Sequence, residues 1–240
     1  HQVPGLYEAF GTEQFDEMYE KYERAYSVPK EKVNAQELFM KLLKERAETG
    51  RIYIMNIDHC NSHSSFTDKI SMSNLCQEIT LPTIPLTSQN DEEGEIALCI
   101  LSAINVGQMT NDLKEMPELC DLAVRALDEV IDYQNYPVKA AEISTKKRRS
   151  LGIGYIGLAH FLAKNKVKYD DEEAHKLVHR LTEHFQYNLL KTSIQLAKEK
   201  GDCDGWNDTK YFGGQLPIDH YKKDVDEIVK PEYECDWESL

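Results

Sequence analysis

The sequence predicts an α/β fold, because segments with helical periodicity occur along the chain together with short apolar segments typical of strands. Four segments carry apolar residues at three- and four-residue spacing, which indicates amphipathic helices. Two shorter segments are rich in apolar residues: the first indicates a strand, and the second fits a buried strand or a helix. The helical segments are 12–26, 34–50, 117–133 and 170–200, and the strand segments are 51–57 and 96–106.

The helix over residues 34–50 is predicted from its ends as well as its spacing. Asn34 precedes it and Glu37 lies three residues on, so each side chain can bond the other's free backbone N–H as a capping box. Gly50 supplies a left-handed end. We expect this helix, like the one before it, to pack on a sheet through an apolar stripe. That stripe consists of Leu38, Phe39, Leu42, Leu43 and Ala47.

The stretch from Asn74 to Glu78 places an amide, a thiol and a carboxylate at alternate positions. In an extended backbone alternate side chains point the same way, so Asn74, Cys76 and Glu78 would line one wall. Such a wall combines a hydrogen-bonding amide, a sulfur atom and a general base. The alternative is an ordinary half-buried strand in which Cys76 is a small apolar residue.

The second half of the chain is predicted to be largely helical. Residues 96–106 are a nearly continuous apolar run, which is ambiguous between a buried strand and a helix. The helix over residues 117–133 is strongly amphipathic, and residues 170–200 form one long helix or two, ended by Gly201. A short helix is predicted around residues 219–229.

Three glycines at 152, 154 and 157 match the G-x-G-x-x-G pattern of dinucleotide-binding proteins. That pattern indicates a nucleotide site only after an apolar strand, and the preceding residues here are charged. Glycine at these positions would equally allow a helix to pack closely against a neighbouring strand. We favour the packing interpretation.

Two partial metal-binding patterns occur, and neither is complete. Cys60-x-x-His63, with His59 beside it, has the spacing of half a zinc site. Glu172-x-x-His175, with His179 on the same face, has the spacing of half a carboxylate di-iron site. Because the second half of each site is missing, we expect no metal, and a metal-binding protein remains an alternative.

Composition excludes several classes of function. The net charge of −14 argues against broad contacts with nucleic acid or an anionic membrane. Apolar runs are too short to cross a bilayer. Six scattered cysteines favour a reducing compartment, so we expect a cytoplasmic protein. The chain starts at His1 and stops at Leu240, and both ends look cut from something longer.

Several motifs together resemble one family. Asn-Leu-Cys-x-Glu at 74–78, followed by Ile-x-Leu-Pro, resembles the active-site segment of the large, catalytic subunit of class I ribonucleotide reductase. The segment from Gly94 to Asn105 is similar to the family strand that carries a redox-active cysteine. Further likeness lies at 51–53, 58–61 and 148–154, and the resemblance runs from about Val3 to Leu240.

The resemblance implies a fold for the chain and indicates which part of a longer protein it would be. Residues 1–240 would be a middle portion of the catalytic domain, a ten-stranded α/β barrel with several long flanking helices. Residues 96–106 would then be a buried strand leading into helix. The nucleotide-binding cone and the C-terminal tail would lie outside the chain, so this portion would be truncated at both ends.

The resemblance also implies roles for individual residues. Cys76 would be oxidised transiently to a thiyl radical, and Glu78 would act as general base. Asn74 would bind the ribose, with Ser73 and Glu78 also contacting substrate. Cys99 would be a redox thiol whose family partner lies upstream of His1, although Cys60 and Cys120 are possible local substitutes.

The resemblance also implies a substrate and protein partners. The substrate would be a ribonucleoside diphosphate, reduced to the deoxyribonucleotide. The radical would come from a metal-containing small subunit, electrons from thioredoxin or glutaredoxin, and nucleotide effectors would bind segments outside this chain. No cofactor would be bound by this portion, which would be active only with complementary large-subunit segments. A non-catalytic interaction or regulatory module of the same fold is the alternative.

Overall fold

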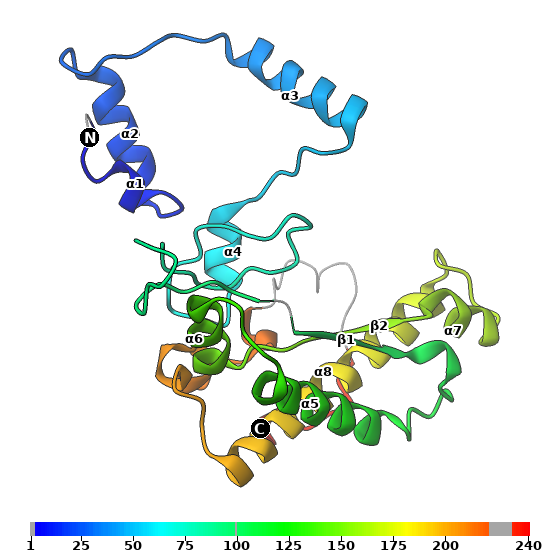
Figure 1. Ribbon diagram of the computed structural model, residues 1–240. Coiled ribbons are helices and arrows are strands. Elements are labelled where there is room, and N and C mark those ends of the chain that lie inside the picture. The colour runs from blue at the N-terminus through cyan, green and yellow to red at the C-terminus, as the bar shows by residue number, and fades with distance from the viewer. Residues whose placement is uncertain (1–2, 99, 221–231) are drawn as a thin grey trace. The chain divides into compact units, whose positions relative to one another are not determined.

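Figure 1 shows the computed structural model, which describes residues 3–98, 100–220 and 232–240. The chain divides into two compact units, His1–Thr83 and Ile84–Leu240. The described residues combine many helices with one two-stranded parallel sheet, which confirms the mixed helix and sheet class. Within these described ranges the sheet does not close into a barrel.

The first unit is built from helices and irregular chain. Its helices are α1 (Leu6–Ala9), α2 (Gln14–Arg24), α3 (Ala35–Thr49) and α4 (Ile57–His63). The predicted ends of α3 are confirmed: Asn34 Oδ1 accepts hydrogen bonds from the backbone N–H groups of Gln36 and Glu37, and Gly50 is left-handed with φ 64°. Local capping chemistry therefore fixes both ends of this helix.

The strand predicted at 51–57 is wrong. Residues 51–56 are irregular, and α4 begins at Ile57. The carbonyl of Ile52 accepts a hydrogen bond from Arg46 Nη1 at 2.7 Å, so a side chain of α3 occupies a group that a ladder would need. A strand without a partner is not stable in water, and the described part of this unit offers none.

The burial predicted for the α3 stripe is also wrong. Leu38 and Phe39 are each 58% exposed, and α3 contains no buried residue. Amphipathic spacing predicts which face is apolar, but burial needs a surface to receive that face. Among its described residues the first unit has no sheet to supply such a surface.

The second unit is organised around two parallel strands. β1 (Leu101–Asn105) pairs with β2 (Gly152–Ile156), Leu101 lying opposite Gly152. The strand predicted at 96–106 is therefore shorter, and the short turn η1 (Val106–Gln108) follows it. The helices are α5 (Met116–Tyr133), α6 (Lys139–Arg148), α7 (Leu158–Lys164) and α8 (Glu172–Lys200), which confirms the two long helices.

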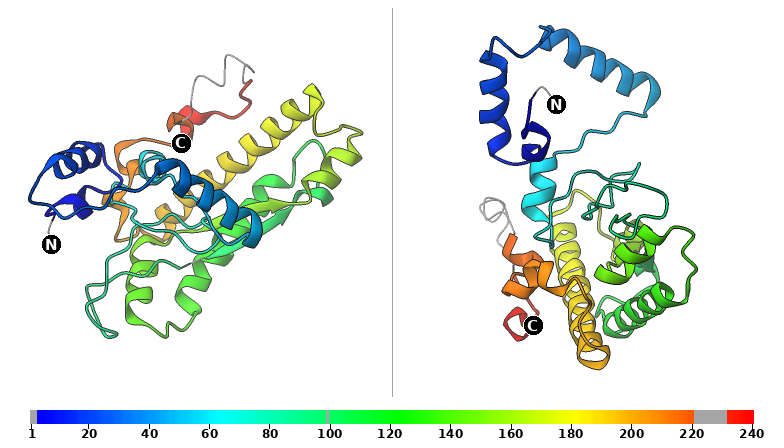
Figure 2. Two further views of the ribbon diagram at one scale, coloured as in Figure 1. Left: turned by 90° about the horizontal axis from the view of Figure 1, so that it is seen from above. Right: turned by 60° about the vertical axis from the view of Figure 1, so that its left-hand side comes forward.

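Helices α5 and α8 run side by side along the sheet (Figure 2). The core lies where α5, α8, α7 and the end of β1 meet, and Tyr155 packs edge-on against Phe185 with ring centroids 5.4 Å apart. Short turns follow α8: η2 (Trp206–Asp208), η3 (Lys210–Gly213), η4 (Pro217–His220) and, at the end, η6 (Trp237–Ser239). Most of the helix predicted around 219–229 lies outside the described residues. The buried core residues are Ile104, Val106, Met109, Leu113, Met116, Cys120, Phe161, Leu181 and Phe185.

Two of the three glycines in the G-x-G-x-x-G pattern, Gly152 and Gly157, lie where a Cβ atom would clash, whereas a Cβ atom on Gly154 would meet nothing within 4 Å. Gly152 and Gly154 lie within β2, and Gly157 makes the turn into α7 with φ 81°. A Cβ atom on Gly157 would lie 2.5 Å from Asn105 Oδ1 and 3.0 Å from the backbone nitrogen of Gly107. The ends of the two strands therefore approach too closely for any side chain at 157, as the packing interpretation requires.

Gly157→Ala should lower the free energy of unfolding by about 2 kcal/mol or more, because left-handed strain of about 1–2 kcal/mol adds to a backbone clash. Gly214→Ala is the matched control, since Gly214 has φ 74° but its Cβ would meet nothing within 4 Å. Chemical denaturation measures both variants. Equal losses of unfolding free energy in the two variants would show that the backbone clash at Gly157 adds nothing to the left-handed strain.

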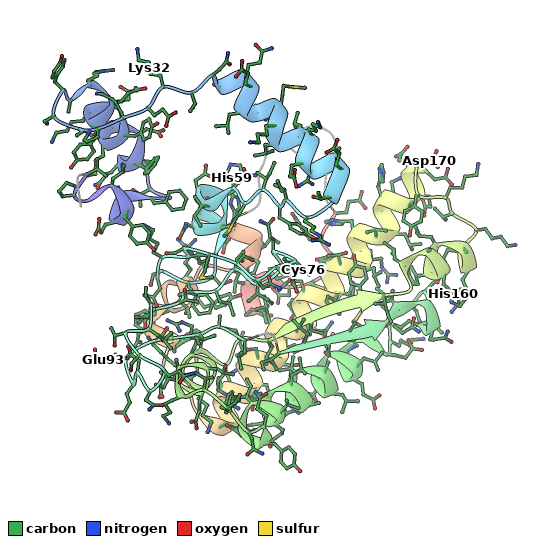
Figure 3. All side chains as sticks on the ribbon, turned by 45° about the horizontal axis from the view of Figure 1, so that its top comes forward. Lys32, His59, Cys76, Glu93, His160 and Asp170 are labelled. Carbon is green, nitrogen blue, oxygen red and sulfur yellow. The ribbon has the colours of Figure 1, made fainter. Side chains whose placement is uncertain are left out.

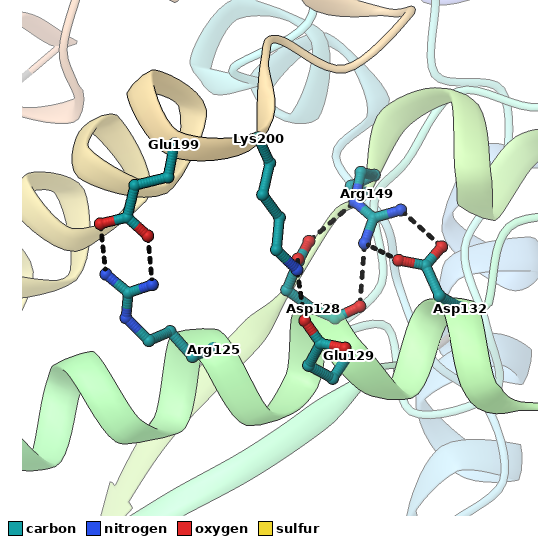
Figure 4. A network of polar contacts seen from close by, with 7 residues as sticks. All are labelled: Arg125, Asp128, Glu129, Asp132, Arg149, Glu199 and Lys200. Atoms are coloured by element: carbon teal, nitrogen blue, oxygen red, sulfur yellow. Dashed lines mark hydrogen bonds and ion pairs between the residues drawn. The ribbon is translucent and has the colours of Figure 1, made fainter.

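A network of charged side chains joins the ends of α5, α6 and α8 (Figure 4). Arg149 Nε donates to Asp128 Oδ1 at 2.7 Å, and Lys200 Nζ donates to Asp128 Oδ2 at 2.9 Å. Arg149 also bonds Asp132 through two nitrogens. Burial alone would raise the pKa of the Asp128 carboxyl, but the hydrogen bonds and charges of Arg149 and Lys200 lower it below its ordinary value.

Asp128→Asn should lower the Tm at pH 7 by about 3–6 °C, because two charge-assisted hydrogen bonds are weakened. A carboxyl with a lowered folded-state pKa stabilises the protein above its unfolded pKa of about 3.9 and loses that contribution as the pH falls through the folded value. The Tm difference between wild type and variant should therefore narrow from pH 7 to pH 3. Thermal melts that show the same difference at both values would contradict this assignment.

Candidate active site

Residues 73–79 form a hydrogen-bonded loop. Leu75 and Cys76 occupy a turn, Gln77 has a left-handed φ of 67°, and the backbone N–H of Gln77 donates to the carbonyl of Asn74 at 3.2 Å. The extended wall expected for Asn74, Cys76 and Glu78 is therefore wrong, because alternation of side chains needs a continuous extended backbone. Asn74 and Cys76 lie in this turn, and Glu78 follows it.

Two side chains close the base of this loop. Asn74 Oδ1 accepts a hydrogen bond from the backbone N–H of Ile79 at 3.0 Å. Ser73 Oγ donates to the carbonyl of Ile79 at 2.9 Å and lies 3.2 Å from Asn74 Oδ1. Side-chain bonds of this kind offer the backbone an alternative to a ladder, which explains why a turn replaces the strand.

The loop presents its chemical groups outward in this unit. Cys76, labelled in Figure 3, is exposed, and so is Glu78, whereas Ser73 and Asn74 are half-buried. A thiol and a carboxylate that face outward can meet a substrate or another polypeptide segment. The loop thus brings together four of the five predicted site residues.

Cys99 lies outside the described residues. The backbone on either side is held: Ile96 N–H donates to the carbonyl of Ala140 at 3.1 Å, and Gly152 N–H donates to the carbonyl of Ile100 at 2.9 Å. Cys120, one possible local partner, is fully buried in the core, and burial raises the pKa of its thiol to about 12. A thiol so protonated is a poor nucleophile, which argues against Cys120 in thiol exchange.

Asn61 anchors the chain that leads to the loop, a role that its position in the stretch 58–61 did not reveal. Asn61 Oδ1 accepts from the backbone N–H of Ile70 at 2.8 Å, and Nδ2 donates to the carbonyl of Ile70 at 2.9 Å. The amide thus pairs with both backbone groups of a fully buried residue, as a neighbouring strand would. An asparagine inside a short helix, where its propensity is low, was the available clue.

Glu183 is a second residue that sequence patterns did not reveal. Its buried carboxylate accepts hydrogen bonds from the backbone N–H groups of Glu234 and Cys235 and from Trp237 Nε1 at 3.2 Å. Beside it, Arg180 bonds the side chain of Glu234 at 2.8 Å. Helix α8 therefore holds residues 232–240 through a buried acceptor.

The two partial metal patterns do not assemble further among the described residues. No group of three or more His, Cys, Asp or Glu is placed to hold a metal ion in these ranges. His63 Nδ1 instead lies 3.1 Å from the carbonyl of His59 and 2.9 Å from Ser62 Oγ. Glu172 pairs with Lys176 at 3.3 Å.

Two further features of the described residues bear on where a functional site could lie. An apolar groove of about 590 Å³ runs between α5 and β1, and none of the predicted site residues lines it. No helix in the described ranges combines the length and apolarity that a membrane span requires. The loop at 73–79 is therefore the strongest candidate for chemistry in the described chain.

A family model described as the ribonucleotide reductase barrel domain matches residues 1–240. The chain belongs to the ribonucleotide reductase family. The family predicted from residues 74–82 and 94–105 is thus confirmed.

Three relatives of the chain are alpha subunits of ribonucleoside-diphosphate reductases. It is 56% identical over 243 residues to the ribonucleoside-diphosphate reductase subunit alpha of Haemophilus influenzae and 53% identical to ribonucleoside-diphosphate reductase 1 subunit alpha of Escherichia coli. The corresponding subunit of Enterobacteria phage T4 is 43% identical over 247 residues. These alignments cover 99–100% of the chain but only 32% of each relative, so the chain spans about a third of their length.

Proposed function

We propose that this chain forms part of the catalytic barrel domain of the alpha subunit of a ribonucleoside-diphosphate reductase. The observation that carries the proposal is the loop at 73–79, which presents the Cys76 thiol and the Glu78 carboxylate from a base closed by Ser73 and Asn74. Identity above 50% over nearly the whole chain to the alpha subunits of Haemophilus influenzae and Escherichia coli supports it. β1 and β2 would be two strands of the ten-stranded barrel.

The proposed reaction begins with a hydrogen atom. A thiyl radical at Cys76 removes the 3′-hydrogen of the ribose, which gives a thiol and a carbon radical. An S–H bond is similar in strength to a C–H bond beside oxygen, so this transfer is reversible. Glu78 accepts the 3′-hydroxyl proton as general base while the 2′-hydroxyl takes up a proton and leaves as water.

Two thiols then complete the reduction. Cys99 and a partner cysteine each give up a hydrogen and form a disulfide, and the two electrons and two protons balance the loss of water and the new 2′-hydrogen. Cys76 returns its hydrogen to the 3′-carbon and becomes a thiyl radical again. The partner thiol of Cys99 belongs to another segment of the longer protein in this proposal.

The polar groups of the loop would bind the ribose. Asn74 Oδ1 is engaged by Ile79, which leaves the Asn74 amide nitrogen as the donor to substrate. The Ser73 hydroxyl hydrogen points to the carbonyl of Ile79, so Ser73 would meet substrate as an acceptor. Holding the ribose against the thiol and the carboxylate is the positioning that such chemistry requires.

The proposed assembly needs partners. Complementary segments of the alpha subunit would complete the barrel, a metal-containing small subunit would supply the radical, and thioredoxin or glutaredoxin would reduce the disulfide. Nucleotide effectors would bind other segments. This portion would hold no cofactor, bind no nucleic acid or membrane, and work in the cytoplasm.

Reduction of CDP by the full-length protein tests the proposal. The protein is combined with its small subunit, a nucleotide effector and a dithiol, and dCDP is measured by chromatography. We expect dCDP to form, and CTP to be a poorer substrate. Absence of product from both nucleotides in the complete assembly would overturn the proposal and favour a regulatory module.

A further inference from the structure

The loop at 73–79 contains a clamp formed by two adjacent side chains. Asn74 Oδ1 accepts from the N–H of Ile79 at 3.0 Å, and Ser73 Oγ donates to the carbonyl of the same residue at 2.9 Å. Both backbone groups of Ile79 are therefore held by residues five and six positions earlier. The two ends of the loop cannot separate without breaking these bonds.

We propose that Ser73 is a positioning residue, whose hydroxyl holds the loop closed and thereby sets where the Cys76 thiol and the Glu78 carboxylate lie. The inference rests on the proposed function for its activity readout. Ser73 acts through the backbone of Ile79, which follows Glu78 directly. Removing its hydroxyl leaves the Ile79 carbonyl without this donor and leaves Asn74 alone at the base.

The clamp matters because the backbone at the tip of the loop has an unfavourable conformation. Gln77 has a φ of 67°, a region that residues with side chains seldom occupy. Such a conformation persists where surrounding contacts hold it, and here the contacts are those at the loop base. With one of them removed, Gln77 can relax, and the flanking residues Cys76 and Glu78 move with it.

Displacement of the reacting groups would appear in the rate of the chemical step. Reacting atoms must be held within about 3–3.5 Å of one another, and a displacement of about 1 Å can lower the rate about 100-fold. A residue that only contacts substrate in the ground state would instead alter KM at constant kcat. The two roles of Ser73 are therefore separable by kinetics.

The experiment compares Ser73→Ala and Ser73→Thr with wild type in the full-length protein assembled with its small subunit. Ser73→Ala should lower kcat by about 10–100-fold, a larger factor than the rise in KM from the lost substrate contact, and Ser73→Thr should recover most of the loss in kcat because it keeps the hydroxyl. A second readout needs no activity. The rate at which iodoacetamide modifies Cys76 should change at least about three-fold in Ser73→Ala, with Cys60 and Cys120 unchanged as internal controls.

The outcomes separate the possibilities. Wild-type kcat and wild-type alkylation in Ser73→Ala would overturn the inference, and so would a rise in KM alone. Faster modification of Cys60 and Cys120 together with Cys76 would also overturn it, because Ser73 would then support the whole fold. If the wild-type assembly reduces no nucleotide but Ser73→Ala changes only Cys76 alkylation, the proposed function fails and the positioning role stands.

Discussion

Glu95→Ala should lower the free energy of unfolding by about 3–5 kcal/mol, the usual loss when one member of a buried ion pair is removed. The side chains of Glu95 and Arg148 are 4% and 3% exposed and are directly hydrogen-bonded. Lys147 Nζ lies 3.1 Å from the same carboxylate. The alanine variant takes the Glu95 carboxylate away from a guanidinium that is almost fully buried, and the loss of this buried charge pairing is the source of the destabilisation.

The position of Glu95 gives the pair a structural role. Glu95 and Ile84 form an antiparallel bridge, with backbone hydrogen bonds of 3.0 and 3.2 Å, and the carboxylate ties this bridge to the end of α6. The segment from Glu95 leads into β1. Loss of the pair should therefore loosen the entry to the sheet as well as destabilise the unit.

Denaturant titration of three variants checks this prediction. Glu142→Ala is the control, because Glu142 pairs with Lys139 and Lys146 at 3.0 and 2.8 Å in a more exposed position and should lose less than about 1 kcal/mol. A Glu95→Leu/Arg148→Met double variant should be more stable than Glu95→Ala, since both members of the buried pair are then replaced by apolar side chains. If the double variant is as unstable as the single one, packing rather than charge explains the loss.

Helix ends and long helices could be predicted because their signals are local. Asn34, Gly50 and Gly201 mark helix ends in the sequence and do so in the structure. The periodicity of α5 and α8 extends over 18 and 29 residues, so neighbours in sequence determine it. These elements need little from the rest of the chain to be recognised.

The residues of the candidate site were predicted from the sequence, but the backbone conformation of their loop was not. A period-two pattern from Asn74 to Glu78 fits a strand, yet Ser73 and Asn74 bond the backbone of Ile79 and close a turn. Such side-chain bonds compete with a ladder and leave no periodic trace. The strand at 51–57 failed for a related reason, since strands depend on partners that sequence spacing does not specify.

Cys76→Ala should lower nucleotide reduction on the order of 10⁴-fold or more, as expected for loss of the residue that exchanges the hydrogen atom in the proposed mechanism. Alanine offers neither a sulfur radical nor a transferable hydrogen. Because Cys76 is exposed at the tip of its loop, the substitution removes little packing, and the Tm should change by less than about 2 °C. Product formation by the full-length assembly, with Cys203→Ala as a control that stays within about two-fold of wild type, measures the effect.

Cys76→Ser separates chemistry from shape. Serine is close to cysteine in size and keeps a polar hydrogen, so a residue needed only for packing or hydrogen bonding would tolerate it. An O–H bond is much stronger than the ribose C–H bond, and an oxygen radical at this position could not be formed by the same route or exchange hydrogen reversibly. Cys76→Ser should therefore be as inactive as Cys76→Ala while binding nucleotide with wild-type affinity. Substantial turnover by the serine variant would remove the thiyl radical from the mechanism and leave Glu78 and Asn74 to act with a different hydrogen acceptor.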